Sequence, residues 1–250
     1  MTTPRIALIT GAGRGIGAAT ARLLAERGFD IAINYTRNAA AAEGVAAEVR
    51  SLGRRALLVR ADVAVEAEVL VMFDAVDRGL GRISALINNA GIVDMKARLD
   101  EMSTARFKRM LDVNVLGTLV CSREAIKRMS TRHGGAGGSI VNLSSIAASL
   151  GAPGMYVDYA ASKGAIDSLT LGLAREVATE GVRVNAVRPG IIDTEIHADS
   201  GDADRPQKSA SIIPMQRPGT ALEIAQAIGW LVSDDASYVT GTVLGVSGGR

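Results

Sequence analysis

The sequence contains little cysteine and little histidine, and each shortage excludes a class of site. Cys121 is the only cysteine among the 250 residues. An intrachain disulfide, a zinc site built on paired cysteines and a CxxC redox centre are therefore excluded, which fits a reducing compartment. The two histidines, His133 and His197, stand in different polar segments and lack the spacing of a metal-ligand pair. We expect both on the surface, and we expect no metal site.

Long hydrophobic runs and a large excess of one charge are also missing. No apolar stretch reaches the roughly 18 residues that a membrane-spanning helix needs. The net charge is only +2 and aromatic residues make up 3%, so a basic, aromatic nucleic-acid face is not expected. The first residues lead directly into Ile6–Ile9 without the pattern of a secretory signal. These features predict a cytoplasmic protein whose partner is a small molecule, with no nucleic acid and no membrane.

The chain does contain a regular alternation of short aliphatic runs and longer alanine-rich segments. This alternation is typical of an α/β fold in which helices cover both faces of a parallel sheet. We expect one domain over residues 1–250, with a polar lid over residues 193–214. The expected strands are Arg5–Ile9, Asp30–Asn34, Ala56–Arg60, Ala85–Asn88, Ser139–Leu143, Arg183–Val187 and Val243–Val246. The expected helices are Ala18–Arg27, Ala40–Leu52, Glu66–Arg78, Phe107–Met129, Tyr159–Thr179 and Leu222–Leu231.

A glycine-rich turn, Thr10-Gly-Ala-Gly-Arg-Gly-Ile-Gly17, stands between the first expected strand and the first expected helix. A turn in this position presents unpaired backbone N–H groups and the positive end of a helix, and both favour a pyrophosphate. Glycine lets the backbone approach such a ligand closely. The context therefore predicts a dinucleotide site.

Tyr159 and Lys163 are four residues apart, so on a helix their side chains emerge from the same face. An ammonium beside a phenol favours the phenolate, so we expect Lys163 to lower the pKa of Tyr159. The alternative is an exposed helix with a solvated lysine. The strand upstream ends in Ser144-Ser145, at the carboxyl edge where ligands of open α/β sheets bind, and this favours a catalytic interpretation.

The turn matches T-G-x-x-x-G-x-G, Asn88-Asn-Ala-Gly91 ends the fourth strand, and Pro189-Gly190 follows the sixth. With these motifs the whole chain resembles the classical short-chain dehydrogenase/reductase family. The resemblance implies a single-domain Rossmann-like doubly wound parallel sheet of about seven strands. It also implies an oxidoreductase that transfers a hydride between NAD(P)(H) and a carbonyl or alcohol. A catalytically silent dinucleotide-binding sensor or scaffold is the alternative, and it requires a broken catalytic set.

The resemblance also implies roles for individual residues. Tyr159 is expected to be the acid/base group, Lys163 to bind the nicotinamide ribose, and Asn114 to hold a water that links Lys163 to solvent. Ser145 is expected to be the catalytic serine; Ser144 is the alternative, because the loop before Tyr159 is about one residue longer than the family's shortest version. Asp62 and Val63 would flank the adenine, and Pro189, Gly190, Ile192 and Thr194 would hold the nicotinamide amide. The complete set expected at the cofactor is Gly11, Arg14, Gly15, Ile16, Gly17, Arg37, Asp62, Val63, Asn88, Ala90, Gly91, Tyr159, Lys163, Pro189, Gly190, Ile192 and Thr194.

The end of the second strand favours NADP(H) over NAD(H). An NAD site usually has Asp or Glu there, and its carboxylate binds the ribose hydroxyls. This chain reads Ile31-Ala-Ile-Asn-Tyr-Thr-Arg37, and Asp30 lies at the opposite end of the strand. Arg37 and Arg14 would instead bind the 2′-phosphate. If both arginines are merely solvated, the site accepts either cofactor.

The resemblance also implies a homo-oligomer, a tetramer formed through the helices at Phe107–Met129 and Tyr159–Thr179. Burial of these helices against the chain's own sheet is the alternative. The expected substrate is a sugar, a small ketone or a 3-oxoacyl compound. We favour a sugar or small ketone, because Tyr156, Asp158 and the lid offer both aromatic and polar groups.

Overall fold

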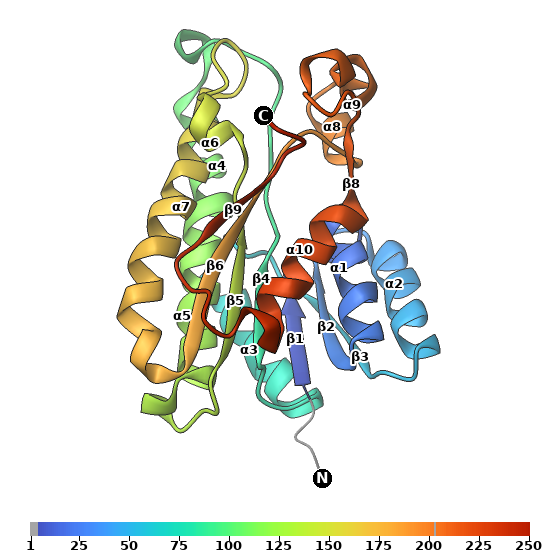
Figure 1. Ribbon diagram of the computed structural model, residues 1–250, viewed down its shortest axis with the longest axis vertical. Helices are drawn as coiled ribbons and strands as arrows, with labels where there is room; N and C mark the ends of the chain where they lie inside the picture. Colours follow the sequence, from blue (N-terminus) through green and yellow to red (C-terminus); the bar gives the residue numbers. More distant parts are fainter. Residues whose placement is uncertain (1–4, 203) are drawn as a thin grey trace.

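The fold is built on a seven-stranded sheet in the order β3-β2-β1-β4-β5-β6-β9 (Figure 1). The computed structural model describes residues 5–202 and 204–250. Every strand pair in this sheet is parallel. This architecture confirms the predicted Rossmann-like sheet. The strands are β1 (Arg5–Ile9), β2 (Phe29–Tyr35), β3 (Ala56–Arg60), β4 (Ala85–Asn88), β5 (Gly138–Leu143), β6 (Val182–Pro189) and β9 (Val243–Val246).

Helices cover both faces of the sheet, and the alternation of side chains along each strand decides which face they meet. Ala7 and Ile9 of β1 pack in the core that also holds α1 (Gly15–Glu26), α2 (Ala39–Ser51) and α10 (Ala221–Val232). Ile6 and Leu8 point to the other core, which holds α3 (Glu66–Gly79), α5 (Gly117–Met129) and α7 (Val157–Val177). A strand buried on both faces reads as a continuous apolar run, which is why the strands could be predicted closely.

The helix predicted at Phe107–Met129 is helical over its whole length, but it starts three residues earlier and is not a regular α-helix throughout. It begins earlier, as α4 (Thr104–Leu111), continues through a π-helical turn at Asp112–Leu116, and becomes α5 at Gly117. A Cβ on Gly117 would lie 2.8 Å from Cγ2 of Val63, so the start of α5 packs tightly on the loop after β3. π-turns of this kind occur frequently at functional sites, and this one contains Asn114.

The strand order reverses between β1 and β4, which is the topological switch point of the sheet. Ligands of open α/β sheets bind outside the carboxyl ends of the strands at this point. The glycine turn after β1, the Asn88–Gly91 segment after β4 and the two serines after β5 all leave the sheet at this edge. Segments that are far apart in the sequence therefore meet there.

The region predicted as a lid contains the short helices α8 (Ile196–Asp199) and α9 (Arg205–Lys208) and stands beyond the carboxyl edge of the sheet (Figure 1). It is flanked by a small parallel pair, β7 (Ile192–Asp193) with β8 (Gly219–Thr220), that the sequence did not predict. A third short helix, α6 (Ala147–Leu150), leads toward α7. In the described part of the chain, no helix is long and apolar enough to span a membrane.

Candidate active site

The glycine turn between β1 and α1 has the backbone conformation of an anion-binding loop. Gly11 and Gly15 have φ angles of 63° and 53°, in the left-handed region where glycine has no steric cost. A Cβ on Gly17 would lie 2.6 Å from Nδ2 of Asn89 and 2.8 Å from the carbonyl oxygen of Gly11. Glycine is therefore required at Gly17 for packing, and at Gly11 and Gly15 for conformation.

Two buried polar side chains hold this turn in place. Oδ1 of Asn34, in β2, accepts a hydrogen bond from the N–H of Gly11 at 3.1 Å, and the Asn34 side-chain amide donates to the carbonyl of Ala61 at 2.9 Å. The Thr10 hydroxyl accepts from the N–H groups of Asn89 and Ala90 at 3.0 and 2.9 Å. Sequence reasoning missed Asn34, although a buried polar residue at the end of an apolar strand was a usable signal.

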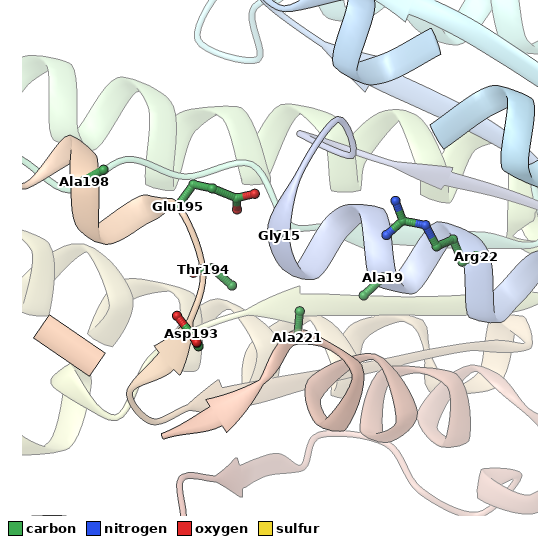
Figure 2. Close-up of a pocket in the computed structure, with 8 residues that line it drawn as sticks. All are labelled: Gly15, Ala19, Arg22, Asp193, Thr194, Glu195, Ala198 and Ala221. Atoms are coloured by element: carbon green, nitrogen blue, oxygen red, sulfur yellow. The ribbon is translucent and has the colours of Figure 1, made fainter. Parts of the chain in front are cut away.

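A cleft of 620 Å³ opens beside the turn (Figure 2). Thr194 and Glu195 lie next to Gly15: a Cβ on Gly15 would be 3.5 Å from Cβ of Thr194 and from Oε2 of Glu195. Figure 2 shows the Glu195 carboxylate directed toward the turn. The glycine turn and the start of α1 fit the pyrophosphate of a dinucleotide. The lining residues are Gly15, Ala19, Arg22, Asp193, Thr194, Glu195, Ala198 and Ala221.

The two candidate serines point in different directions. The Ser145 hydroxyl forms a hydrogen bond with the phenol of Tyr159, and it also accepts from the N–H of Ala147 at 3.1 Å. Ser144 is buried, and its hydroxyl donates to the backbone carbonyl of Lys163 at 3.3 Å. The geometry therefore brings Ser145, and not Ser144, to the tyrosine.

Lys163 lies under this pair with its side chain only 4% exposed. Its Nζ donates to the carbonyl oxygen of Leu143 at 2.7 Å and lies 5.6 Å from the centroid of the Tyr159 ring. Burial lowers the pKa of Lys163 to about 8, although the negative charge of Asp167 acts in the raising direction.

Burial raises the pKa of Tyr159 above its ordinary value, against the lowering effects of the Ser145 hydrogen bond and the Arg205 charge. The expectation that Lys163 lowers this pKa is wrong for the observed geometry. The ammonium lies over the ring, and loss of solvent around the phenol outweighs nearby positive charge. Tyr159 therefore stays protonated at neutral pH and can act as a proton donor.

Asn114 joins the π-turn to the loop after β4. Its Oδ1 accepts from the N–H of Ile92 at 2.8 Å, and its Nδ2 donates to the Ile92 carbonyl at 3.0 Å and to the Ser162 hydroxyl at 3.1 Å. A Cβ on Gly91 would lie 3.4 Å from Oδ1 of Asn114 and 3.5 Å from Nζ of Lys163. Asn114, Gly91 and Lys163 thus converge at one point beside the tyrosine.

Near the carboxyl end of β2, where the sequence predicts the adenine end of the cofactor, Arg14 on the glycine turn and Arg37 after β2 are both exposed. Arg60, which the sequence did not single out, donates from Nε to the carbonyl of Thr36 at 3.2 Å and adds a third guanidinium near the end of β2. Asp62 accepts from the N–H of Ala64 at 3.0 Å, and Val63 is buried.

The remaining predicted cofactor residues fall into two groups. The side chain of Asn88 is buried between the sheet and α5, where it donates to Ser122 and Asn142, so it does not face the edge. Pro189 ends β6, Ile192 begins β7, and a Cβ on Gly190 would lie 2.7 Å from Cα of Ser247, so this wall needs glycine. His133 is exposed as predicted, and the side chain of His197 lies outside the described part of the structure.

A buried ion pair that the sequence did not predict supports the start of the tyrosine helix. Arg106 of α4 donates to both carboxylate oxygens of Asp158, at 2.7 and 3.1 Å. Its third contact is to the carbonyl of Met95 at 2.7 Å. Because Asp158 directly precedes Tyr159, this pair fixes the tyrosine against the loop after β4. The partners are far apart in the sequence, and no local pattern could have identified them.

Comparison with known proteins agrees with this geometry. A family profile described as enoyl-(acyl carrier protein) reductase matches residues 11–250. The chain is 51% identical over 245 residues to the uncharacterized oxidoreductase YgfF of Escherichia coli (strain K12), across 98% of this chain and 99% of that protein. It is 41% identical over 245 residues to cis-4-hydroxycyclohexanecarboxylate dehydrogenase of Sinomonas cyclohexanicum, across 98% and 96%. A solved short-chain dehydrogenase/reductase from Serratia marcescens superimposes with a TM-score of 0.90 at 33% identity, across 98% and 97%.

Proposed function

Since this chain belongs to the classical short-chain dehydrogenase/reductase family, we propose that it transfers a hydride between NADP(H) and a small carbonyl or alcohol substrate. Membership of the family makes it an oxidoreductase of CH–OH and C=O groups with a nicotinamide dinucleotide cofactor. The observation that carries the finer proposal is the convergence of Ser145, Tyr159 and Lys163 at the edge of the sheet that holds the glycine turn.

In this mechanism Tyr159 is the proton donor during reduction. When bound, the dinucleotide supplies the hydride that the substrate carbonyl carbon takes up. Ser145 donates a hydrogen bond to the carbonyl oxygen, and Tyr159 transfers its phenolic proton to that oxygen as negative charge develops there. Lys163 binds the ribose hydroxyls and passes a replacement proton toward the phenol, and Asn114 positions the water that leads to solvent. The raised pKa of Tyr159 keeps the phenol protonated at neutral pH, and the protonated phenol is the form that the reducing direction requires.

The arginines near the end of β2 support NADP(H) as the cofactor. Arg14 on the glycine turn and Arg37 after β2 are both exposed, and β2 ends in Asn34 and Tyr35 rather than in an acid. Guanidinium groups suit phosphate oxygens because they present forked donors.

Residues 193–214 are the proposed lid. One contact joins it to the loop after β4, where Nζ of Lys96 lies 2.7 Å from Oδ2 of Asp202.

The substrate is a small molecule, and one relative offers a chemical guide. The Sinomonas enzyme is named for a cyclic hydroxy acid, and a substrate of that size has both a reacting oxygen and a polar group at its far end. A sugar or a 3-oxoacyl compound also has this layout. A homotetramer is the proposed assembly.

The test is a spectrophotometric assay of NADPH and NADH oxidation with a panel of small ketones, oxo acids and sugars. We expect turnover with at least one class, and Tyr159→Phe should lower turnover at least about a hundredfold while dinucleotide binding is retained. Tyr238→Phe is the matched control, because that phenol is fully exposed. If wild type binds the dinucleotide but reduces none of the compounds in the panel, the protein is instead a silent sensor or scaffold. If Tyr159→Phe keeps wild-type turnover, Tyr159 is not the acid.

A further inference from the structure

A lid arginine and a buried tyrosine meet on the substrate side of the site. Arg205 begins the lid helix α9, and its guanidinium carbon lies 5.1 Å from the centroid of the Tyr156 ring. Tyr156 is the residue before the first turn of α7 and precedes Tyr159 by three positions. The contact therefore places a positive charge of the lid directly beside the start of the catalytic helix.

The polar groups of this pair lack protein partners in the described part of the chain. Tyr156 is 2% exposed, and its hydroxyl makes no hydrogen bond there. Arg205 is half-buried, and no described carboxylate pairs with its guanidinium. By contrast, the other lid cation, Lys208, lies 3.0 Å from an oxygen of Asp202. Buried donors are normally satisfied, so an unpaired phenol under a guanidinium indicates a missing acceptor.

This pair lies within electrostatic reach of the reacting group. The positive charge of Arg205 acts on Tyr159 in the direction that lowers its pKa, although burial raises that pKa overall. Ser145 holds the same phenol through its hydrogen bond. A substrate whose oxygen lies between Ser145 and Tyr159 would therefore extend its other end toward Arg205 and Tyr156.

The other nearby guanidinium is already committed. Arg106 is bonded to both oxygens of Asp158 and to the carbonyl of Met95. It can stabilise the wall of the site, but its charge is paired with Asp158 and three of its five N–H donors are already used. Arg205 is therefore the cation that remains available to a ligand.

We propose that Arg205 and Tyr156 bind a carboxylate of the substrate, so that the preferred substrate is a short hydroxy or oxo carboxylic acid. A guanidinium donates two parallel N–H bonds to a carboxylate, and the Tyr156 hydroxyl supplies a third donor. The guanidinium of Arg205 packs over the ring of Tyr156, and this contact orients it. The identity of the reacting end rests on the proposed function, whereas the anion-binding end rests on this contact.

The kinetic test compares acids with their neutral esters. Wild type, Arg205→Gln, Tyr156→Phe and the control Arg98→Gln are assayed with 4-oxopentanoate, 5-oxohexanoate and the ethyl ester of each. Arg98 is a matched control because its side chain is 71% exposed and pairs with Asp100. We expect Arg205→Gln to lower kcat/KM for the acids about tenfold or more, and to leave the esters and the control unchanged. Tyr156→Phe should also lower kcat/KM for the acids relative to the esters, but by a smaller factor than Arg205→Gln.

A binding test separates this inference from the proposed function. Calorimetric titration of the dinucleotide-loaded protein with hexanoate should show binding at least about tenfold tighter than with hexanamide, and Arg205→Gln should remove that difference. The carboxylate subsite would be overturned if wild type bound the two ligands with equal affinity, or if Arg205→Gln lowered kcat/KM equally for the acids and the esters. Failure of every substrate to turn over would defeat the proposed function, and the titration would still decide the subsite.

Discussion

The Ser145 hydroxyl and the Tyr159 phenol share a hydrogen bond, whereas the neighbouring Ser144 is turned into the base of α7. Adjacent residues at the end of a strand point to opposite sides, so only one of two consecutive serines can face the ligand edge. The observed direction of each hydroxyl leads to the first prediction.

Ser145→Ala should lower turnover in the reducing direction about a hundredfold, because the developing charge on the substrate oxygen loses one preorganised donor. Ser144→Ala should leave turnover within a few fold of wild type and act mainly on stability, since its hydroxyl bonds the backbone of α7. Both are measured by steady-state kinetics and thermal unfolding. The reverse ranking of the two variants in turnover would show that Ser144 is the catalytic serine.

The sequence predicted the sheet closely but could not predict the small elements above it. Four strands, among them β1 and β4, have the predicted bounds. β1 and β4 are buried on both faces, so each is a continuous apolar run in the sequence. The two-residue strands β7 and β8 are stabilised only by pairing with each other, and a dipeptide carries no periodicity. The π-turn at Asp112–Leu116 was missed because no glycine or proline interrupts the helical pattern there.

The site could be predicted only where a motif or a spacing exists. Tyr159 and Lys163 are one helical turn apart, so their proximity follows from the sequence. The Arg106–Asp158 pair and the Arg205–Tyr156 contact join separate segments through tertiary packing, and neither has a local signature. The direction of the Tyr159 pKa shift was also missed, because desolvation depends on burial that the sequence does not show.

The pH dependence of reduction should follow Lys163. The pKa of its ammonium is lowered to about 8, so the cation is lost as pH rises through that value, whereas the raised pKa of Tyr159 keeps the phenol protonated. We therefore expect kcat/KM for reduction to be level near neutrality and to fall above about pH 8. Lys163→Arg keeps its charge, so its profile should lack this fall, whatever its absolute rate.

The same shift has a consequence for stability. The pKa of Lys163 is lower in the folded chain than its ordinary 10.5, so the unfolded state binds more protons between about pH 8 and 10.5. The contribution of Lys163 to the free energy of unfolding therefore rises with pH across this window, by up to about 3 kcal/mol. Denaturant unfolding at pH 8 and pH 10 should show that the free energy of unfolding rises more with pH in wild type than in Lys163→Met. An identical pH response in both proteins would rule out the shift.

The proposed tetramer would cover leucines that are exposed on the helices expected at the interface. Leu119 of α5 and Leu171 of α7 are each 42% exposed. We expect light scattering at micromolar concentration to give a tetramer for wild type, and a smaller species for the double variant Leu119→Asp, Leu171→Asp. Leu52→Asp is the control, because Leu52 is 43% exposed but follows α2 on the other face of the sheet. A wild-type monomer would contradict the proposal.

Cofactor selectivity should depend on Arg14 and Arg37. Each charge-assisted contact to the 2′-phosphate contributes roughly 1.5–3 kcal/mol, so we expect kcat/KM to favour NADPH over NADH by about tenfold or more. Arg14→Ala and Arg37→Ala should each lower kcat/KM with NADPH selectively. Arg82→Ala is the control, because Arg82 lies before β4 at the amino end of the sheet. Preference of wild type for NADH, or equal effects of the variants on both cofactors, would contradict the phosphate site.

Glu195 should weaken dinucleotide binding through its charge. Its Oε2 would lie only 3.5 Å from a Cβ on Gly15, so a carboxylate stands beside the turn that is expected to receive the pyrophosphate. Like charges about 4 Å apart repel by about 1 kcal/mol in water, and salt screens this repulsion. Glu195→Gln should therefore tighten the binding of ADP-ribose about threefold at low salt, and less in 0.5 M NaCl.

Calorimetric titration with two nucleotides makes this prediction specific to the pyrophosphate. Adenosine 2′-monophosphate lacks the pyrophosphate bridge and should bind wild type and Glu195→Gln equally. Asp193→Asn is the matched variant, because Asp193 lines the same cleft but accepts a hydrogen bond from Gln207 at 3.3 Å, away from Gly15. If Glu195 instead held the start of the lid against the glycine turn as a structural contact, Glu195→Gln would weaken ADP-ribose binding. Only tighter binding that fades with salt agrees with repulsion between the carboxylate and the pyrophosphate.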